Sequence, residues 1–157
     1  MSTRTIVASL WVLSVIPAFA AASDTLVTIN EFVASNRTGL LDGDGRASDW
    51  IELFNSGTRA ISLNGWHLTD NADDLRKWPF PPGFAVPAKG FLVVIASGEA
   101  VDDYIDSKGY AHTNFALDKD GEYLALVDSN GQIAQEYSPS FPAQETDISY
   151  GLQADLL

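Results

Sequence analysis

Short β-rich runs separated by glycines constrain the fold of this chain more than any other feature. Val, Ile, Leu and aromatic residues gather in short segments, and most of the 12 glycines stand between them. Such spacing is typical of strands joined by tight turns, whereas a helix needs apolar residues that recur every three or four positions. Seven strands are predicted, over residues 26–33, 49–55, 60–63, 66–70, 91–96, 123–128 and 133–137. Strands of this number and length favour an all-β sandwich or barrel.

The hydropathy pattern indicates which strands are central. In residues 61–69 apolar side chains alternate with polar ones, as in strands with one buried face. Residues 91–96 and 123–127 are apolar on both faces, which predicts central strands covered on each side. Asn130 and Gly131 lie between the last two predicted strands and predict a tight hairpin turn with positive φ angles. Only residues 99–108 leave room for a short helix, and residues 23–157 contain no linker that would divide the domain.

Charge and cysteine content exclude several classes of function. The chain has nine Lys and Arg against 21 Asp and Glu, a net charge of -12. Such a surface repels phosphate backbones, so nucleic acid is not expected as a partner. With no cysteine there is no disulfide, no thiolate metal site and no cysteine nucleophile. Stability must therefore come from packing, or from packing and a bound ion.

The N-terminus has the layout of a secretory signal peptide. Arg4 precedes an apolar run over residues 6–19, and small residues follow it, with Ala20 as the simplest cleavage position. The alternative is a membrane anchor, but a span needs about 20 apolar residues. We therefore expect residues 1–22 to be a signal peptide and the remainder to be exported, to the periplasm, the cell surface or the medium. A membrane association is expected only if the signal is not cleaved.

Seven segments in register carry a family resemblance. They are Ile29-Asn30-Glu31-Phe32-Val33-Ala34-Ser35-Asn36, the stretch from Asp42-Gly43-Asp44-Gly45 through Ser48-Asp49-Trp50-Ile51-Glu52-Leu53-Phe54-Asn55, Leu63-Asn64-Gly65-Trp66-His67-Leu68-Thr69-Asp70, Lys77-Trp78-Pro79-Phe80-Pro81, Gly90-Phe91-Leu92-Val93-Val94, His112-Thr113-Asn114-Phe115 and Gly121-Glu122-Tyr123-Leu124. Together they resemble the lamin-tail domain family as it occurs in exported bacterial proteins. Each segment alone is weak, but their common order covers nearly all of residues 23–157.

The resemblance implies a fold and a class of function. It implies an immunoglobulin-like β-sandwich, in agreement with the strands predicted above, and no enzymatic activity of the module itself. Its family-level role is attachment or interaction, usually beside other domains. Family members generally continue beyond the counterpart of residues 149–152, so a first domain of a longer protein is expected. The implied partner is a protein or a cell-surface component.

An acidic, glycine-rich loop is the candidate metal site. Asp42, Asp44 and Asp49 supply the oxygen ligands that a hard cation prefers, so calcium is the ion to expect if any cofactor is bound. The loop is not an EF-hand, because a motif that begins at Asp42 places Leu53 at the bidentate Glu position. The alternative is a surface turn whose Asp side chains accept hydrogen bonds from their own backbone.

The segment around Trp78 and Phe80 is the candidate partner or glycan surface. Its prolines cannot donate to a regular strand ladder, so the two aromatic side chains either cover a sheet edge or face a partner. Aromatic rings beside carboxylates stack on sugars, so a carbohydrate-binding module is the alternative to a protein-binding one. Trp50 and Trp66 lie in strand patterns and are expected in the core.

No catalytic residues are predicted. His67 and His112 lack the spacing of a zinc site, and the chain has neither G-x-S-x-G nor a Walker motif. The sequence therefore favours a non-enzymatic interaction or anchoring module of an exported protein. The remaining alternative is an accessory domain of a secreted enzyme whose catalytic part lies downstream.

Overall fold

The computed structural model describes residues 26–152, which form an all-β sandwich with no helix in that range. The strands are β1 (Val27–Val33), β2 (Asp49–Asn55), β3 (Ile61–Ser62), β4 (His67–Thr69), β5 (Trp78–Pro79), β6 (Ala85–Val86), β7 (Phe91–Ala96), β8 (Leu124–Val127), β9 (Ile133–Tyr137) and β10 (Tyr150–Gly151). All seven predicted strands are present. The three additional ones, β5, β6 and β10, are two residues long and carry no readable periodicity.

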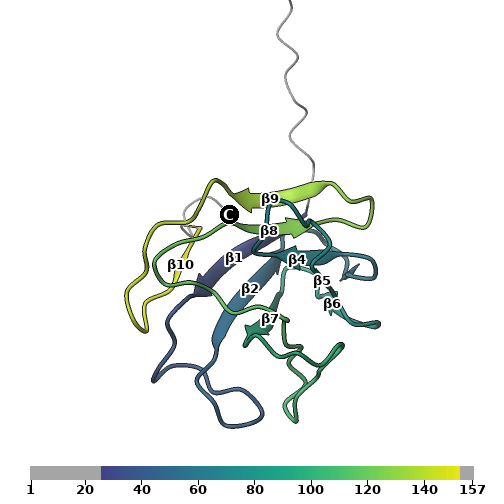
Figure 1. The fold of residues 1–157 in the computed structure, drawn as a ribbon. Coiled ribbons are helices and arrows are strands. Elements are labelled where there is room, and N and C mark those ends of the chain that lie inside the picture. Colours follow the sequence, from purple (N-terminus) through teal and green to yellow (C-terminus); the bar gives the residue numbers. More distant parts are fainter. Residues whose placement is uncertain (1–25, 153–157) are drawn as a thin grey trace, which may run out of the picture.

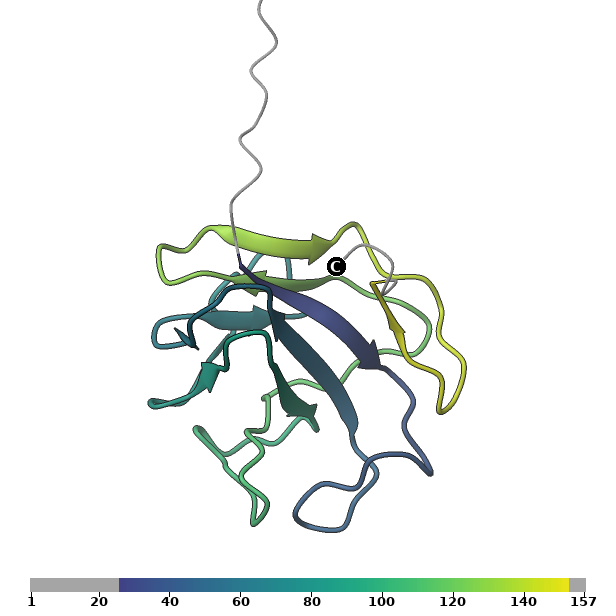
Figure 2. The same cartoon turned by 180° about the vertical axis from the view of Figure 1, so that it is seen from behind.

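Two antiparallel sheets form the layers of the sandwich. One has the strand order β10-β1-β2-β7 and the other β5-β4-β8-β9, with the small β3-β6 pair beside them. Figure 1 shows β8 and β9 lying across β1 and β2, and Figure 2 shows the same arrangement from behind. In both views the loops after β1 and after β7 emerge at the end of the sandwich opposite the β8–β9 hairpin. That end carries the acidic loop.

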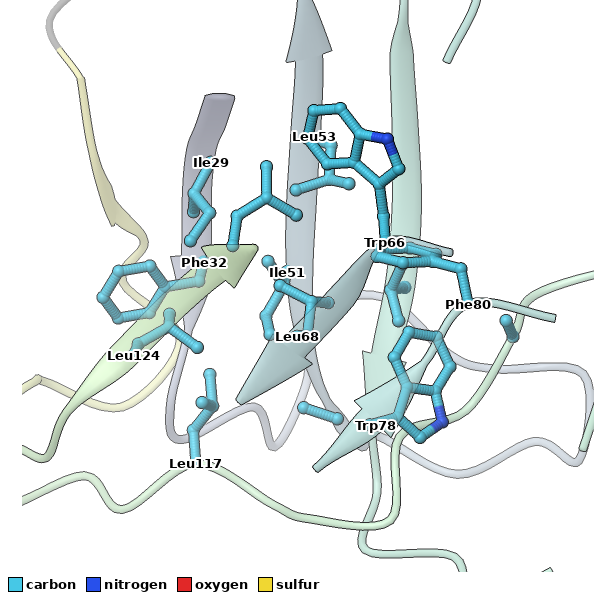
Figure 3. Close-up of a cluster of buried hydrophobic side chains, with 14 of the residues drawn as sticks. Ile29, Phe32, Ile51, Leu53, Trp66, Leu68, Trp78, Phe80, Leu117 and Leu124 are labelled. Carbon is cyan, nitrogen blue, oxygen red and sulfur yellow. The ribbon is translucent and has the colours of Figure 1, made fainter. Parts of the chain in front are cut away.

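The core lies between the two sheets. Ile51 and Leu53 of β2 face Leu68, Leu124 and Leu126 of the other sheet, and all five are fully buried. Figure 3 shows these strands with Trp66, Trp78 and Phe80 filling one side of the same cluster. Because alternate side chains of a strand point to opposite faces, the apolar side chains of the alternating segment 61–69 point into this core.

Three local predictions need correction. β7 is an edge strand and not a central one, although the backbone of residues 111–113 bonds to Ile95 and covers part of its outer side. Residues 99–108 form turns and no helix. The β8–β9 hairpin is confirmed, but in its turn only Gly131 has a positive φ angle, because the loop is longer than the two-residue type predicted.

The predicted signal peptide and its cleavage position at Ala20 lie outside the described residues. Within residues 26–152 there is no helix of the length and hydropathy that crossing a bilayer requires.

Candidate functional site

The acidic loop is organised by hydrogen bonds to Asp42. Its Oδ1 accepts bonds from the backbone N–H groups of Asp44 (3.0 Å) and Arg46 (2.8 Å), and its Oδ2 accepts one from the Ser48 hydroxyl (3.0 Å). Asp42 is only 1% exposed. This is the alternative that the sequence left open, a turn closed by an Asp side chain that bonds its own backbone.

The other two candidate ligands accept hydrogen bonds from residues outside the turn that Asp42 closes. Asp44 Oδ2 accepts a bond from the Tyr104 hydroxyl (2.8 Å), and Asp49 Oδ1 accepts one from the Asn36 backbone N–H (2.9 Å). Burial raises the pKa of Asp49, and the hydrogen bonds from the Asn36 and Leu117 backbone only partly oppose that rise. Among residues 26–152, no three His, Cys, Asp or Glu side chains gather as metal ligands. The structure therefore does not bring Asp42, Asp44 and Asp49 together as a ligand set.

A buried His–Asp pair fastens the acidic loop to the loop after β7. Asp106 Oδ2 lies 3.2 Å from His112 Nε2 and also accepts the Gly43 backbone N–H. Asp106 Oδ1 accepts the backbone N–H groups of Lys108 and Tyr110. The Tyr104 ring packs edge-on against the His112 ring, with centroids 4.9 Å apart. Asp106 is buried among these donors, although nothing in its local sequence distinguishes it from an exposed acid.

Competing effects act on the Asp106 carboxyl. Burial on its own raises the pKa of Asp106, but the hydrogen bonds from the Gly43 and Tyr110 backbone, from His112 and from Lys108 outweigh it, so the pKa is lowered. Asp106 is therefore a carboxylate at neutral pH. Its charge orients the His112 ring so that Nε2–H donates to the carboxylate. Nδ1 is then left to accept a hydrogen bond.

The donor of that hydrogen bond is Ser97, whose Oγ lies 2.9 Å from His112 Nδ1. Ser97, His112 and Asp106 thus stand in a row that resembles the connectivity of a hydrolytic triad. The His112 side chain is only 1% exposed and is covered by Tyr104. A general base must reach the substrate or its leaving group, and this ring reaches neither. The geometry favours a structural clamp between loops over nucleophilic catalysis.

The prediction that Trp78 and Phe80 form a partner surface is wrong. Each is only 4% exposed, and their rings pack edge to face with centroids 4.8 Å apart inside the core cluster. The reason is the pairing of β5 with β4, which places Trp78 opposite Leu68. Trp78 also lines a pocket of about 250 Å³ between β5 and residues 101–103.

The outer face of the β10-β1-β2-β7 sheet carries the exposed aromatic side chains instead. Phe91 is 50% exposed and its ring packs on that of Phe54, with centroids 4.8 Å apart. Trp50 and Val93 lie on the same face and are half-buried, so the expectation that Trp50 lies in the core is wrong. We call Trp50, Phe54, Phe91 and Val93, with Glu31 and Glu52, the outer sheet patch.

Two acidic residues of the outer sheet patch face each other. Glu31 of β1 is directly opposite Glu52 of β2, and Asn30 Nδ2 donates to Glu52 Oε1 (2.8 Å). Burial raises the pKa of Glu52, the Asn30 bond lowers it and the charge of Glu31 raises it further. Like charges directly opposite one another on a sheet are destabilising.

Comparison with known proteins agrees with this architecture. A sequence model of the lamin tail domain matches residues 20–140. The chain belongs to the lamin tail domain family. The fold of this lamin tail domain is the immunoglobulin-like β-sandwich expected from the resemblance. A search of curated proteins finds no match.

Several segments that carried the resemblance have structural roles in this lamin tail domain. Asn36 donates to the carbonyls of Leu40 and Ser48 and so shapes the acidic loop. Trp66 and Trp78 fill the core, and His112 belongs to the clamp. The sequence did not indicate the roles of its partners Ser97 and Asp106, because neither residue belongs to a local motif.

Proposed function

We propose that this lamin tail domain is a non-enzymatic interaction or anchoring module of an exported protein, and that it binds a protein or cell-surface partner through the outer sheet patch. The polar groups that suggested chemistry are committed to internal bonds: Asp42 to its own loop, and His112 to Ser97 and Asp106. The outer sheet patch, by contrast, leaves half of the Phe91 ring exposed and holds two carboxylates, of which Glu52 accepts one bond from Asn30.

The observation that carries the proposal is the placement of Glu31 opposite Glu52 beside the half-exposed Phe91 ring. A folded domain gains nothing by placing two acidic side chains opposite each other. A basic side chain of a partner would lie between them and remove the repulsion, while its apolar neighbours cover Phe91 and Val93. Interfaces of this kind combine an aromatic centre with charge complementarity.

Site-specific photocrosslinking tests this surface. A photoreactive phenylalanine analogue is placed at position 91, and a control carries it at Ser129, in the exposed β8–β9 turn. Each protein is irradiated with the surface fraction of the source cells. We expect one discrete adduct at position 91, lost in the Glu31→Gln, Glu52→Gln variant. The same adduct at both positions would contradict the proposal. So would an adduct at position 91 that forms equally well in the double variant.

Export and attachment are tested by the intact mass and the N-terminal residue of the protein isolated from its source. The signal-like residues 1–22 support cleavage after Ala20. A mature protein that starts at Ala21 and exceeds the mass of residues 21–157 would support a leading module of a longer exported chain. A catalytic domain downstream would make it an accessory module, and an uncleaved N-terminus would contradict export by this route.

A further inference from the structure

One partly buried ion pair holds its two groups close enough to react with each other. Lys77 Nζ lies 2.6 Å from Asp70 Oδ1 and 2.9 Å from Asp70 Oδ2, and the two side chains are 31% and 12% exposed. Because Cγ lies between the two oxygens, Nζ is within about 3–3.5 Å of that carbon, the separation at which reacting atoms meet. The pair is therefore placed for chemistry as well as for charge pairing.

The oxygen nearest to Lys77 lacks a hydrogen bond. Asp70 Oδ1 is enclosed from solvent, and no donor among residues 26–152 forms a hydrogen bond with it, although Nζ is so close. Nζ thus approaches the carboxyl group outside the direction of a hydrogen bond. An enclosed carboxylate oxygen without a hydrogen bond costs free energy, and that cost disappears if the oxygen leaves.

The pair is set between two strand ends and against an aromatic ring. Asp70 follows β4 and Lys77 precedes β5, and these two strands are paired. The Nζ atom is 5.4 Å from the centroid of the Phe115 ring, which is itself buried. Because strand pairing fixes both backbones, the two side chains meet without the entropy cost of bringing free groups together.

A second carboxyl group belongs to the same surroundings. Glu122 lies shortly before β8, the other neighbour of β4 in the sheet, and its Oε1 accepts the Asp118 backbone N–H at 2.7 Å. Burial raises the pKa of Glu122, the Asp118 bond lowers it, and the charge of Asp70 raises it further, so the pKa is above its ordinary value. A carboxyl group whose pKa is closer to the working pH is a better carrier of protons.

We propose that Lys77 and Asp70 condense to an amide crosslink in the folded domain. Lys77 Nζ bonds to Asp70 Cγ, and the bond from Cγ to Oδ1 breaks. Two protons of the ammonium group leave with Oδ1 as water, and the third stays on the amide nitrogen. Glu122 carries a proton from the nitrogen to the departing oxygen. The two charges cancel in the product, and the step needs no oxidant, reductant or other reactant.

The folded domain favours this product over the ion pair. Two partly buried charges carry a desolvation cost that a neutral amide does not. The crosslink would tie β5, an edge strand of two residues, covalently to β4. The chain has no cysteine, so a disulfide cannot provide such a tie. The crosslink does not involve the outer sheet patch, so either proposal stands if the other fails.

Peptide mapping by mass spectrometry tests the crosslink. The protein is unfolded in urea, which separates an ion pair but not an amide, and is digested with trypsin. A crosslink blocks cleavage after Lys77 and joins residues 60–76 to residues 77–89 in one branched peptide. We expect this peptide, lighter than its two parts by one water, with fragmentation locating the link at Asp70 and Lys77. Unlinked peptides alone would overturn the proposal, and so would a water lost at an Asp-Gly pair instead.

Matched variants assign the roles of the side chains. Lys77→Arg keeps the positive charge but removes the nucleophilic amine, so no branched peptide should form. Glu122→Gln should lower the linked fraction in freshly synthesised protein, because a proton carrier contributes about 100-fold or more to the rate of such a step. Lys119→Arg is the control, since Lys119 Nζ lies 2.7 Å from Asp120 Oδ1 in a pair that is exposed.

The control variant should form the branched peptide as the parent does, and residues 119 and 120 should stay unlinked in both. A link at residue 70 in the Lys77→Arg variant would overturn the assignment of the nucleophile. A linked fraction equal to that of the parent in Glu122→Gln would overturn the role of Glu122 as proton carrier.

Discussion

The side-chain amide of Gln135 satisfies both backbone groups of Ile29. The Ile29 N–H donates to Gln135 Oε1 at 2.7 Å, and Gln135 Nε2 donates to the Ile29 carbonyl at 3.3 Å. β1 changes register with β2 between Ile29 and Glu31, and β10 pairs with β1 only at Glu31 and Phe32. The amide of Gln135, from β9 of the other sheet, thus replaces a missing strand neighbour and closes this side of the sandwich.

Gln135→Met should destabilise the domain by about 1–3 kcal/mol, because Met fills a similar volume but leaves a buried N–H and C=O of Ile29 without partners. Urea unfolding followed by fluorescence measures the loss. Gln132→Met is the control, since Gln132 is exposed on the neighbouring turn and its side chain has no bonded partner among the described residues. Equal stability of the two variants would show that the Gln135 bonds contribute nothing.

The clamp formed by Ser97, His112 and Asp106 should contribute less to the free energy of unfolding in acid. The pKa of Asp106 is lower in the folded protein than its ordinary value of 3.8 in the unfolded chain. Its contribution is therefore complete at neutral pH and is lost as the pH falls below about 4 and then through the folded pKa. Asp49, Glu52 and Glu122 have raised pKa values and contribute with the opposite sign.

The difference between the parent and Asp106→Asn isolates the contribution of Asp106. We expect this variant to be less stable at pH 7 by about 1–3 kcal/mol, because Asn replaces the charged acceptor of several buried N–H donors. The gap should narrow towards pH 3. Urea unfolding at a series of pH values measures it, and a gap that stays constant or widens in acid would refute the assignment.

Trp78→Ala should destabilise the protein by about 3–5 kcal/mol, because it opens a large cavity in the core. Phe91→Ala removes a ring that is half exposed, and its effect on stability should stay within about 1 kcal/mol. Thermal unfolding by calorimetry compares the two. Were Trp78 a surface residue, the two variants would unfold at similar temperatures.

Glu31→Gln should leave the free domain slightly more stable, by about 0.2–1 kcal/mol, because it removes the charge opposite Glu52. The gain should shrink in high salt, which screens the same repulsion. Thermal unfolding at low and high ionic strength measures both effects. A loss of stability at low salt would show that Glu31 has a structural role instead.

Calcium should leave the melting temperature unchanged. An ion that bound only the folded state would raise it by mass action, but Asp42 already accepts three protein hydrogen bonds. Calorimetry with millimolar calcium and with a chelator tests this. A rise of several degrees that disappears in Asp42→Asn would mean that the loop rearranges to hold the ion.

The sequence by itself determined the main strands, most of the core and the turn glycine at Gly131. These features depend on local physics: the two-residue period of a strand makes Ile51 and Leu53 point inward, and a positive φ angle selects glycine. The order of seven motifs was also enough to identify the family.

Only the tertiary structure decided the roles of Trp78, Asp106 and Gln135. Trp78 lies in a proline-rich segment without periodicity, and its burial follows from pairing with β4. Asp106 looks like any exposed acid until the Gly43 backbone, 63 residues away, donates to it. Gln135 lies 106 residues from Ile29. Hydrogen bonds between residues so far apart in sequence leave no local pattern, because the fold alone brings the two groups together.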